Sequence, residues 1–123
     1  MDQISHIIGG VSVTGASGRT SPVFNPATGD QSAEVALADT AEVDAAVRVA
    51  ADAAEGWRAS SLAQRTKLMY KFRNLVDSHV DDIAARVTAE HGKVLSDAAG
   101  EVARGLENIE FACGIAESLK GSY

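Results

Sequence analysis

The hydrophobic pattern of the chain changes near residue 39. Before that point, short segments alternate between apolar and polar residues, as at residues 11–14 and 33–37, which is the period of β-strands. Turn-forming residues separate these segments, most densely at residues 25–30, where a proline fixes φ and a glycine accepts a positive φ. We therefore predict a small antiparallel β-meander over residues 1–38.

After residue 39, apolar residues recur every three or four positions, which is the spacing of amphipathic α-helices. Two capping boxes mark helix starts, because a polar side chain precedes each apolar stripe and an acid or amide follows three residues later. Asp39 with Glu42 predicts the start of the first helix, and Ser61 with Gln64 predicts the start of the second.

The third and fourth helices have weaker boundary signals. Ser78 is expected to cap the third helix, and Gly92 is expected to end it, because glycine accepts the left-handed conformation that follows many helices. A fourth helix is expected over residues 94–119. The chain is thus predicted to be an α+β fragment, with a short antiparallel β-meander over residues 1–38 followed by about four α-helices over residues 39–123.

The expected fourth helix is apolar on two opposite sides. One stripe follows the helical period and consists of Val102, Leu106, Ile109, Cys113 and Ala116. Phe111 and Ile115 lie on the other side, which they share with Arg104. A helix that is apolar nearly all round is buried on more than one face, so we expect more protein to cover it than 123 residues supply. The alternative is a central helix in a small bundle.

Composition and charge narrow the class of protein. A length of 123 residues suits one domain, and 46% hydrophobic with 23% charged residues is ordinary for a globular protein. The net charge of −6 and the lack of a basic run argue against a nucleic-acid partner. No apolar run reaches the length of a membrane span, and one cysteine allows no internal disulfide. We therefore expect a cytoplasmic protein that binds neither nucleic acid nor a membrane.

The chain offers few residues for catalysis. Cys113 lies on the apolar stripe and is interpreted as a structural core cysteine. His6, His79 and His91 lack the spacing of metal ligands, and the sequence contains no G-x-G-x-x-G loop for phosphate binding. We expect no catalytic residue and no cofactor-binding residue within residues 1–123.

Arg104 is the one candidate for substrate binding. A guanidinium group matches a carboxylate with two parallel hydrogen bonds, which a lysine cannot reproduce. Glu101 and Glu107 lie three residues to either side of Arg104, so the alternative is an exposed ion pair within the helix. Spacing alone leaves both interpretations open, and the exposed ion pair is the more common arrangement.

Four motifs, in their order along the chain, resemble the N-terminal region of aldehyde dehydrogenases. Residues 24–29 are similar to that family's Asn-Pro-x-Thr-Gly turn, residues 90–93 to its acidic-x-Gly-Lys turn, and residues 100–102 to a shared Gly-Glu-Val motif. Residues 103–112 resemble the CoA-acylating methylmalonate-semialdehyde dehydrogenase branch, which carries an arginine in a similar segment. The resemblance extends over essentially the whole chain.

The resemblance implies that residues 1–123 are the N-terminal segment of the NAD-binding domain of an α/β dehydrogenase, without its catalytic and remaining cofactor-binding parts. The complete enzyme would oxidise malonate or methylmalonate semialdehyde with NAD. After loss of CO2 it would pass the acyl group to coenzyme A, giving acetyl- or propionyl-CoA. Arg104 matches the family arginine that holds the substrate carboxylate. The segment alone would be inactive, and its partners would be the rest of its polypeptide or identical subunits of a homo-oligomer.

Some members of the family bind a monovalent cation near the first strands. Glu90 occupies the matching acidic position, and the carbonyl oxygen of Phe24 is the second expected ligand. The alternative for Glu90 is a solvated acid before Gly92. Two other functions stay open: a freestanding helical interaction module derived from a dehydrogenase, and a fragment of a general NAD(P)-dependent aldehyde dehydrogenase in which Arg104 has no substrate role.

Overall fold

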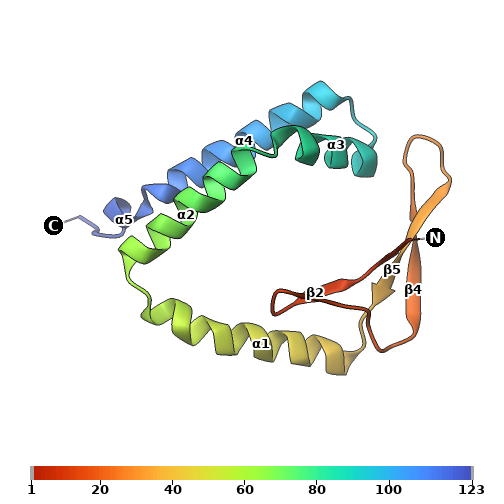
Figure 1. Cartoon of the computed structure of the whole chain (residues 1–123), viewed down its shortest axis with the longest axis horizontal. Helices are drawn as coiled ribbons and strands as arrows, with labels where there is room; N and C mark the ends of the chain where they lie inside the picture. The colour runs from red at the N-terminus through yellow and green to blue at the C-terminus, as the bar shows by residue number, and fades with distance from the viewer. Residues whose placement is uncertain (1, 123) are drawn as a thin grey trace. The chain divides into compact units, whose positions relative to one another are not determined.

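The computed structural model describes residues 2–122 (Figure 1), and the chain divides into two compact units, Met1–Ala59 and Ser60–Tyr123. The first unit holds strands and one helix, and the described residues of the second form helices with short connections. The expected α+β class is confirmed. None of the helices within residues 2–122 is both long and apolar enough to span a membrane.

The strands form two separate sheets in the first unit. Their bounds are β1 Asp2–Ile4, β2 His6–Ile8, β3 Val11–Val13, β4 Arg19–Phe24 and β5 Gln31–Leu37. β5 is the central strand of a three-stranded sheet with the order β1-β5-β4, whereas β2 pairs with β3 in an antiparallel hairpin.

The predicted antiparallel meander is wrong in its topology. β4 and β5 are antiparallel, but β1 runs parallel to β5, with Gln3 opposite Glu34. Alternating residues identify strands through their period of two, whereas they carry no information on which distant strand each one pairs with. The turn at residues 25–30 is as predicted, because the Gly29 N–H donates to the Asn25 oxygen over 2.8 Å and Gly29 has a φ of 77°.

Helix α1, Thr40–Ala59, begins at the predicted capping box. The Asp39 N–H donates to Glu42 Oε2 over 3.0 Å, and the Glu42 N–H donates to Asp39 Oδ1 over 2.8 Å. Glu42 Oε1 also accepts a 2.6 Å hydrogen bond from the backbone N–H of Ala16. One carboxylate therefore fixes both the start of α1 and the loop that precedes β4.

The helices of the second unit are α2 Leu62–Asp77, α3 Val80–His91, α4 Leu95–Cys113 and α5 Ile115–Ser118. α4 packs against both α2 and α3 (Figure 1). The core at this junction consists of small side chains: Ala98 is 0% exposed, Ala84 is 1% exposed and Val102 is 8% exposed. Because side-chain size sets the distance between packed helices, these residues let α3 and α4 approach closely.

The predicted fourth helix is divided into α4 and α5. Gly114 ends α4, and its N–H donates to the Phe111 oxygen over 3.1 Å, which is the tighter spacing of a terminal 3₁₀ turn. Glycine has a low helix propensity, which explains why the helix is interrupted at this residue.

Ser78 does not cap α3, contrary to the prediction. It is the C-cap of α2, and its hydroxyl donates to the Leu75 carbonyl oxygen over 2.9 Å. α3 begins after His79, which makes no side-chain capping bond. Because only two residues separate the helices, Ser78 serves the carbonyl end of the first one. Gly92 ends α3 as predicted, with a φ of 82°.

Ser61→Ala is expected to destabilise the second unit by about 1 kcal/mol. Ser61 Oγ accepts the Gln64 N–H over 3.2 Å, and Gln64 Oε1 accepts the Ser61 N–H over 2.9 Å. Ser78→Ala is the matched control and should cost about half as much or less, since its exposed hydroxyl caps no helix N-terminus. Urea unfolding followed by circular dichroism measures both losses, and equal values would contradict these cap assignments.

Candidate functional site

Arg104 lies in the middle of α4 with its side chain exposed. Its Nη1 atom lies 3.7 Å from the position that a Cβ atom would occupy on Gly100. The guanidinium group therefore extends back along the helix, in the direction that helical side chains prefer. The Arg104 carbonyl oxygen accepts a hydrogen bond from Asn108 Nδ2 over 3.0 Å.

Within residues 2–122, Arg104 forms no ion pair, although Glu101 and Glu107 lie three residues to either side of it. Within the described residues no ion pair of Arg104 with either glutamate is seen, although the charge of Arg104 lowers the pKa of Glu101. A guanidinium group without a carboxylate partner has its N–H donors available for the carboxylate of a ligand.

Lys93 binds the Glu101 carboxylate instead. Lys93 Nζ donates to Glu101 Oε1, and the side chain of Lys93 is 17% exposed whereas that of Glu101 is 45% exposed. This hydrogen bond is the largest cause that holds the pKa of Glu101 below its ordinary value, and the positive charge of Arg104 lowers that pKa further. The Glu101 carboxylate thus lies near two cations, Lys93 and Arg104.

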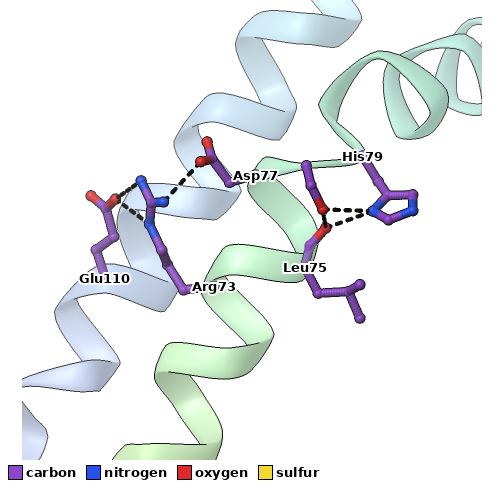
Figure 2. A network of polar contacts seen from close by, with 6 residues as sticks. Arg73, Leu75, Asp77, His79 and Glu110 are labelled. Atoms are coloured by element: carbon purple, nitrogen blue, oxygen red, sulfur yellow. Dashed lines mark hydrogen bonds and ion pairs between the residues drawn. The ribbon is translucent and has the colours of Figure 1, made fainter.

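Arg73 on α2 shows the opposite situation, because two carboxylates occupy its guanidinium group (Figure 2). Its Nε atom donates to Glu110 Oε1 on α4 over 2.9 Å, and its Nη1 atom donates to Asp77 Oδ2 over 2.9 Å. The pKa of Arg73 is raised, mainly by the hydrogen bond to Glu110. Arg73 is therefore a structural link between α2 and α4 and is not a candidate for ligand binding.

Cys113 and His79 have structural surroundings. Cys113 is 4% exposed at the end of α4, as expected for a core cysteine. His79 Nδ1 lies 2.8 Å from the Leu75 oxygen at the junction of α2 and α3 (Figure 2). The part of the chain that the structure describes contains no group of three or more side chains that could hold a metal ion.

The two expected cation ligands lie in different units of the chain. Glu90 is exposed in the last turn of α3. Phe24 ends β4 and is 55% exposed. A cation site that joins Glu90 with the Phe24 carbonyl oxygen therefore stays a prediction.

The surface of α4 and α5 carries exposed apolar residues. Phe111 on α4 is 72% exposed and Ile115 on α5 is 39% exposed, whereas Val102 and Cys113 on α4 are 8% and 4% exposed. Leu119, which follows α5, is 62% exposed. Large apolar side chains that cluster on a surface mark an area that other protein covers. The helix is two-sided, as the sequence predicted, and one side is uncovered within residues 2–122.

Comparison with known proteins identifies the family of this chain. The aldehyde dehydrogenase family matches residues 13–123, which is most of the chain. The chain therefore belongs to the aldehyde dehydrogenase family. The similar solved structures include an NAD-dependent benzaldehyde dehydrogenase from Corynebacterium glutamicum, 30% identical over 94% of this chain and 25% of that one, with a TM-score of 0.85.

Individual relatives point to one branch of this family. Malonate-semialdehyde dehydrogenase of Pseudomonas aeruginosa is 41% identical over 123 residues, which is 100% of this chain and 24% of that protein. The crystal structure of methylmalonate-semialdehyde dehydrogenase from Oceanimonas doudoroffii has a TM-score of 0.93 and 41% identity, over 99% of this chain and 25% of that one. A structure from Sinorhizobium meliloti 1021 in complex with NAD has a TM-score of 0.90 and 41% identity, over 95% of this chain and 24% of that one. The chain thus spans about a quarter of the length of these relatives and matches their N-terminal part.

Sequence reasoning missed the partners of two charged residues. Arg73 and Glu110 lie on different helices, and no periodicity links them. Lys93 and Glu101 lie on either side of the α4 N-terminus. Lys93 and Glu101 each lie in a motif shared with the family. That shared occurrence is the signal from which their contact could have been predicted.

Proposed function

We propose that residues 1–123 are part of a longer NAD-dependent dehydrogenase. It oxidises malonate or methylmalonate semialdehyde and forms acetyl- or propionyl-CoA with release of CO2. The observation that supports this proposal is the guanidinium group of Arg104, which has no ion-pair partner within residues 2–122, in a chain 41% identical to a malonate-semialdehyde dehydrogenase. Because these substrates carry a carboxylate besides the aldehyde, such a group would distinguish them from plain aldehydes.

In this proposal Arg104 binds the carboxylate and orients the aldehyde. Two parallel N–H···O bonds fix both the position and the plane of the carboxylate, which reduces the entropy lost when the aldehyde meets its nucleophile. The nucleophile lies outside residues 1–123. NAD accepts the hydride and coenzyme A accepts the acyl group, and we assign no residue of this chain to either.

We further propose that the rest of the polypeptide, or an identical subunit of a homo-oligomer, covers the exposed face of α4. Phe111 is 72% exposed on that face and lies two helical turns beyond Arg104. Protein that covers Phe111 would also exclude water from around Arg104 and strengthen its attraction for a carboxylate. A cytoplasmic location is part of the same proposal and rests on the sequence alone.

The mass of the native protein is the first test of this function. An antibody against residues 1–123 should detect a protein several times heavier than 12.8 kDa. Once purified, that protein should reduce NAD in the presence of malonate semialdehyde and should form acetyl-CoA when coenzyme A is supplied. A native mass near 12.8 kDa would instead favour a freestanding helical interaction module, for which the exposed face of α4 is the supporting observation. Equal kcat/KM for malonate semialdehyde and propanal would favour a general aldehyde dehydrogenase.

We also propose that Glu90 supplies an oxygen ligand to a monovalent-cation site, since oxygen atoms are the ligands that hard cations prefer. A cation that binds only the folded enzyme stabilises it. Sodium or potassium should therefore raise the Tm of the complete enzyme above its value in choline, and Glu90→Gln should remove the difference. An identical Tm in all three buffers would contradict this site.

A further inference from the structure

We propose that Lys93 is a positioning residue for substrate binding: by holding the Glu101 carboxylate, Lys93 keeps the guanidinium group of Arg104 free for the carboxylate of the substrate. This inference rests on the substrate role of Arg104 proposed above. In this inference Lys93 does not contact the substrate. It acts by binding the Glu101 carboxylate, which would otherwise bind Arg104.

The competition follows from helix geometry. Glu101 precedes Arg104 by three residues on α4, and oppositely charged side chains at this spacing are neighbours that ordinarily attract each other. In this structure the attraction is diverted, because Glu101 Oε1 accepts a hydrogen bond from Lys93 Nζ. Arg104 instead extends over Gly100, where its Nη1 atom lies 3.7 Å from the position of a Cβ atom.

Lys93 is held in a position from which it can bind the Glu101 carboxylate. Gly92 ends α3 in the left-handed conformation, and Lys93 follows it in the connection that leads into α4. The Lys93 side chain is 17% exposed, so most of it is packed against the protein, whereas Lys120 in its ion pair with Glu117 is 60% exposed. A side chain that is already held in place loses less conformational entropy when it forms an ion pair.

Without Lys93, we expect the Glu101 carboxylate to bind the guanidinium group of Arg104. The groups that lower the pKa of Glu101 by their charge are Lys93, then Arg104, then His91. Without Lys93, Arg104 is the strongest remaining cation beside an ionised Glu101. The Glu101 carboxylate would then compete for the guanidinium group and would also repel the substrate carboxylate.

The test is a set of variants in the complete enzyme, assayed with malonate semialdehyde and with propanal. Lys93→Met should raise the KM for malonate semialdehyde about three- to tenfold relative to the KM for propanal, a range between an exposed helical ion pair and one shielded from water. kcat should change much less than KM. Lys93→Arg keeps a cation at this position and should behave like the unmodified enzyme.

Two double variants separate positioning from folding. Lys93→Met with Glu101→Gln should restore the KM ratio, because the competing charge is gone. Lys93→Met with Glu107→Gln removes the other glutamate three residues from Arg104 and should restore nothing, since Glu107 is not the carboxylate that Lys93 releases. A role of Lys93 confined to stability would lower the Tm without this difference between the two double variants.

The outcomes distinguish this inference from the function on which it rests. If Arg104→Leu leaves the KM for malonate semialdehyde unchanged, the substrate role of Arg104 fails, and the inference fails with it. If Arg104→Leu raises KM but Lys93→Met does not, or if both double variants stay impaired, the substrate role survives and the positioning role of Lys93 is overturned.

Discussion

Arg104→Leu in the complete enzyme is expected to raise the KM for malonate semialdehyde about 10- to 100-fold, with little change in the KM for propanal. The variant removes a charge-assisted pair of hydrogen bonds, and bonds to charged groups contribute about 1.5–3 kcal/mol, where each 1.4 kcal/mol corresponds to a factor of about ten. Propanal has no carboxylate, so the same substitution removes nothing that it uses. Steady-state kinetics with both aldehydes measure the difference.

Arg104→Lys distinguishes charge from geometry at the same position. Lysine keeps the positive charge but presents it as a compact ammonium group, without the planar fork that bonds both carboxylate oxygens. The KM for malonate semialdehyde should therefore rise by about tenfold, less than for the leucine variant. Arg86→Leu, which removes an exposed arginine from α3, is the matched control for loss of one positive charge. Equal losses for both aldehydes in the Arg104 variants would show that this residue supports the fold rather than the substrate.

The sequence predicted the parts of the fold that depend on neighbouring residues. The capping boxes at Asp39 and Ser61 and the stop at Gly92 formed as expected, because each rests on hydrogen bonds or backbone angles within a few residues. The prediction that Ser78 caps α3 was wrong, because the end of α2 and the start of α3 both lie beside this hydroxyl. Local spacing does not show which of the two helix ends the hydroxyl bonds. The parallel pairing of β1 with β5 was not predicted, because it joins strands about thirty residues apart in the sequence and no local pattern encodes it.

The candidate site divides in the same way. Residue type and motif identified Arg104, and helical spacing correctly placed Glu101 and Glu107 beside it. The ion pair between Lys93 and Glu101 could not be predicted, because it forms across the turn at Gly92 that joins α3 to α4. The partner of Glu101 is therefore a matter of tertiary structure, although each participating residue is visible in the sequence.

Ala98→Leu is expected to destabilise residues 1–123 by about 1–3 kcal/mol, the usual cost of forcing a larger side chain into a packed core. Ala98 is 0% exposed and lies beside Ala84, which is 1% exposed, and Val102, which is 8% exposed. With such small residues in contact, the helices that surround Ala98 would have to separate to admit an isobutyl group. Within the described residues, no large side chain is fully buried, so little other apolar burial compensates the loss. For a unit of this size the Tm should fall by about 4–8 °C per kcal/mol.

Ala103→Leu makes the same chemical change on an exposed position of the same helix and is the control. Alanine and leucine are both strong helix formers, so a substitution outside the core should change stability by about 0.5 kcal/mol or less. Thermal unfolding of residues 1–123, followed by circular dichroism, compares the two variants directly. If Ala98→Leu melts at the same temperature as Ala103→Leu, the contact between α3 and α4 is too loose to hold Arg104, Glu101 and Lys93 in their observed arrangement. In that case the proposed covering protein, rather than the contact between α3 and α4, would have to hold the side chain of Arg104 in place.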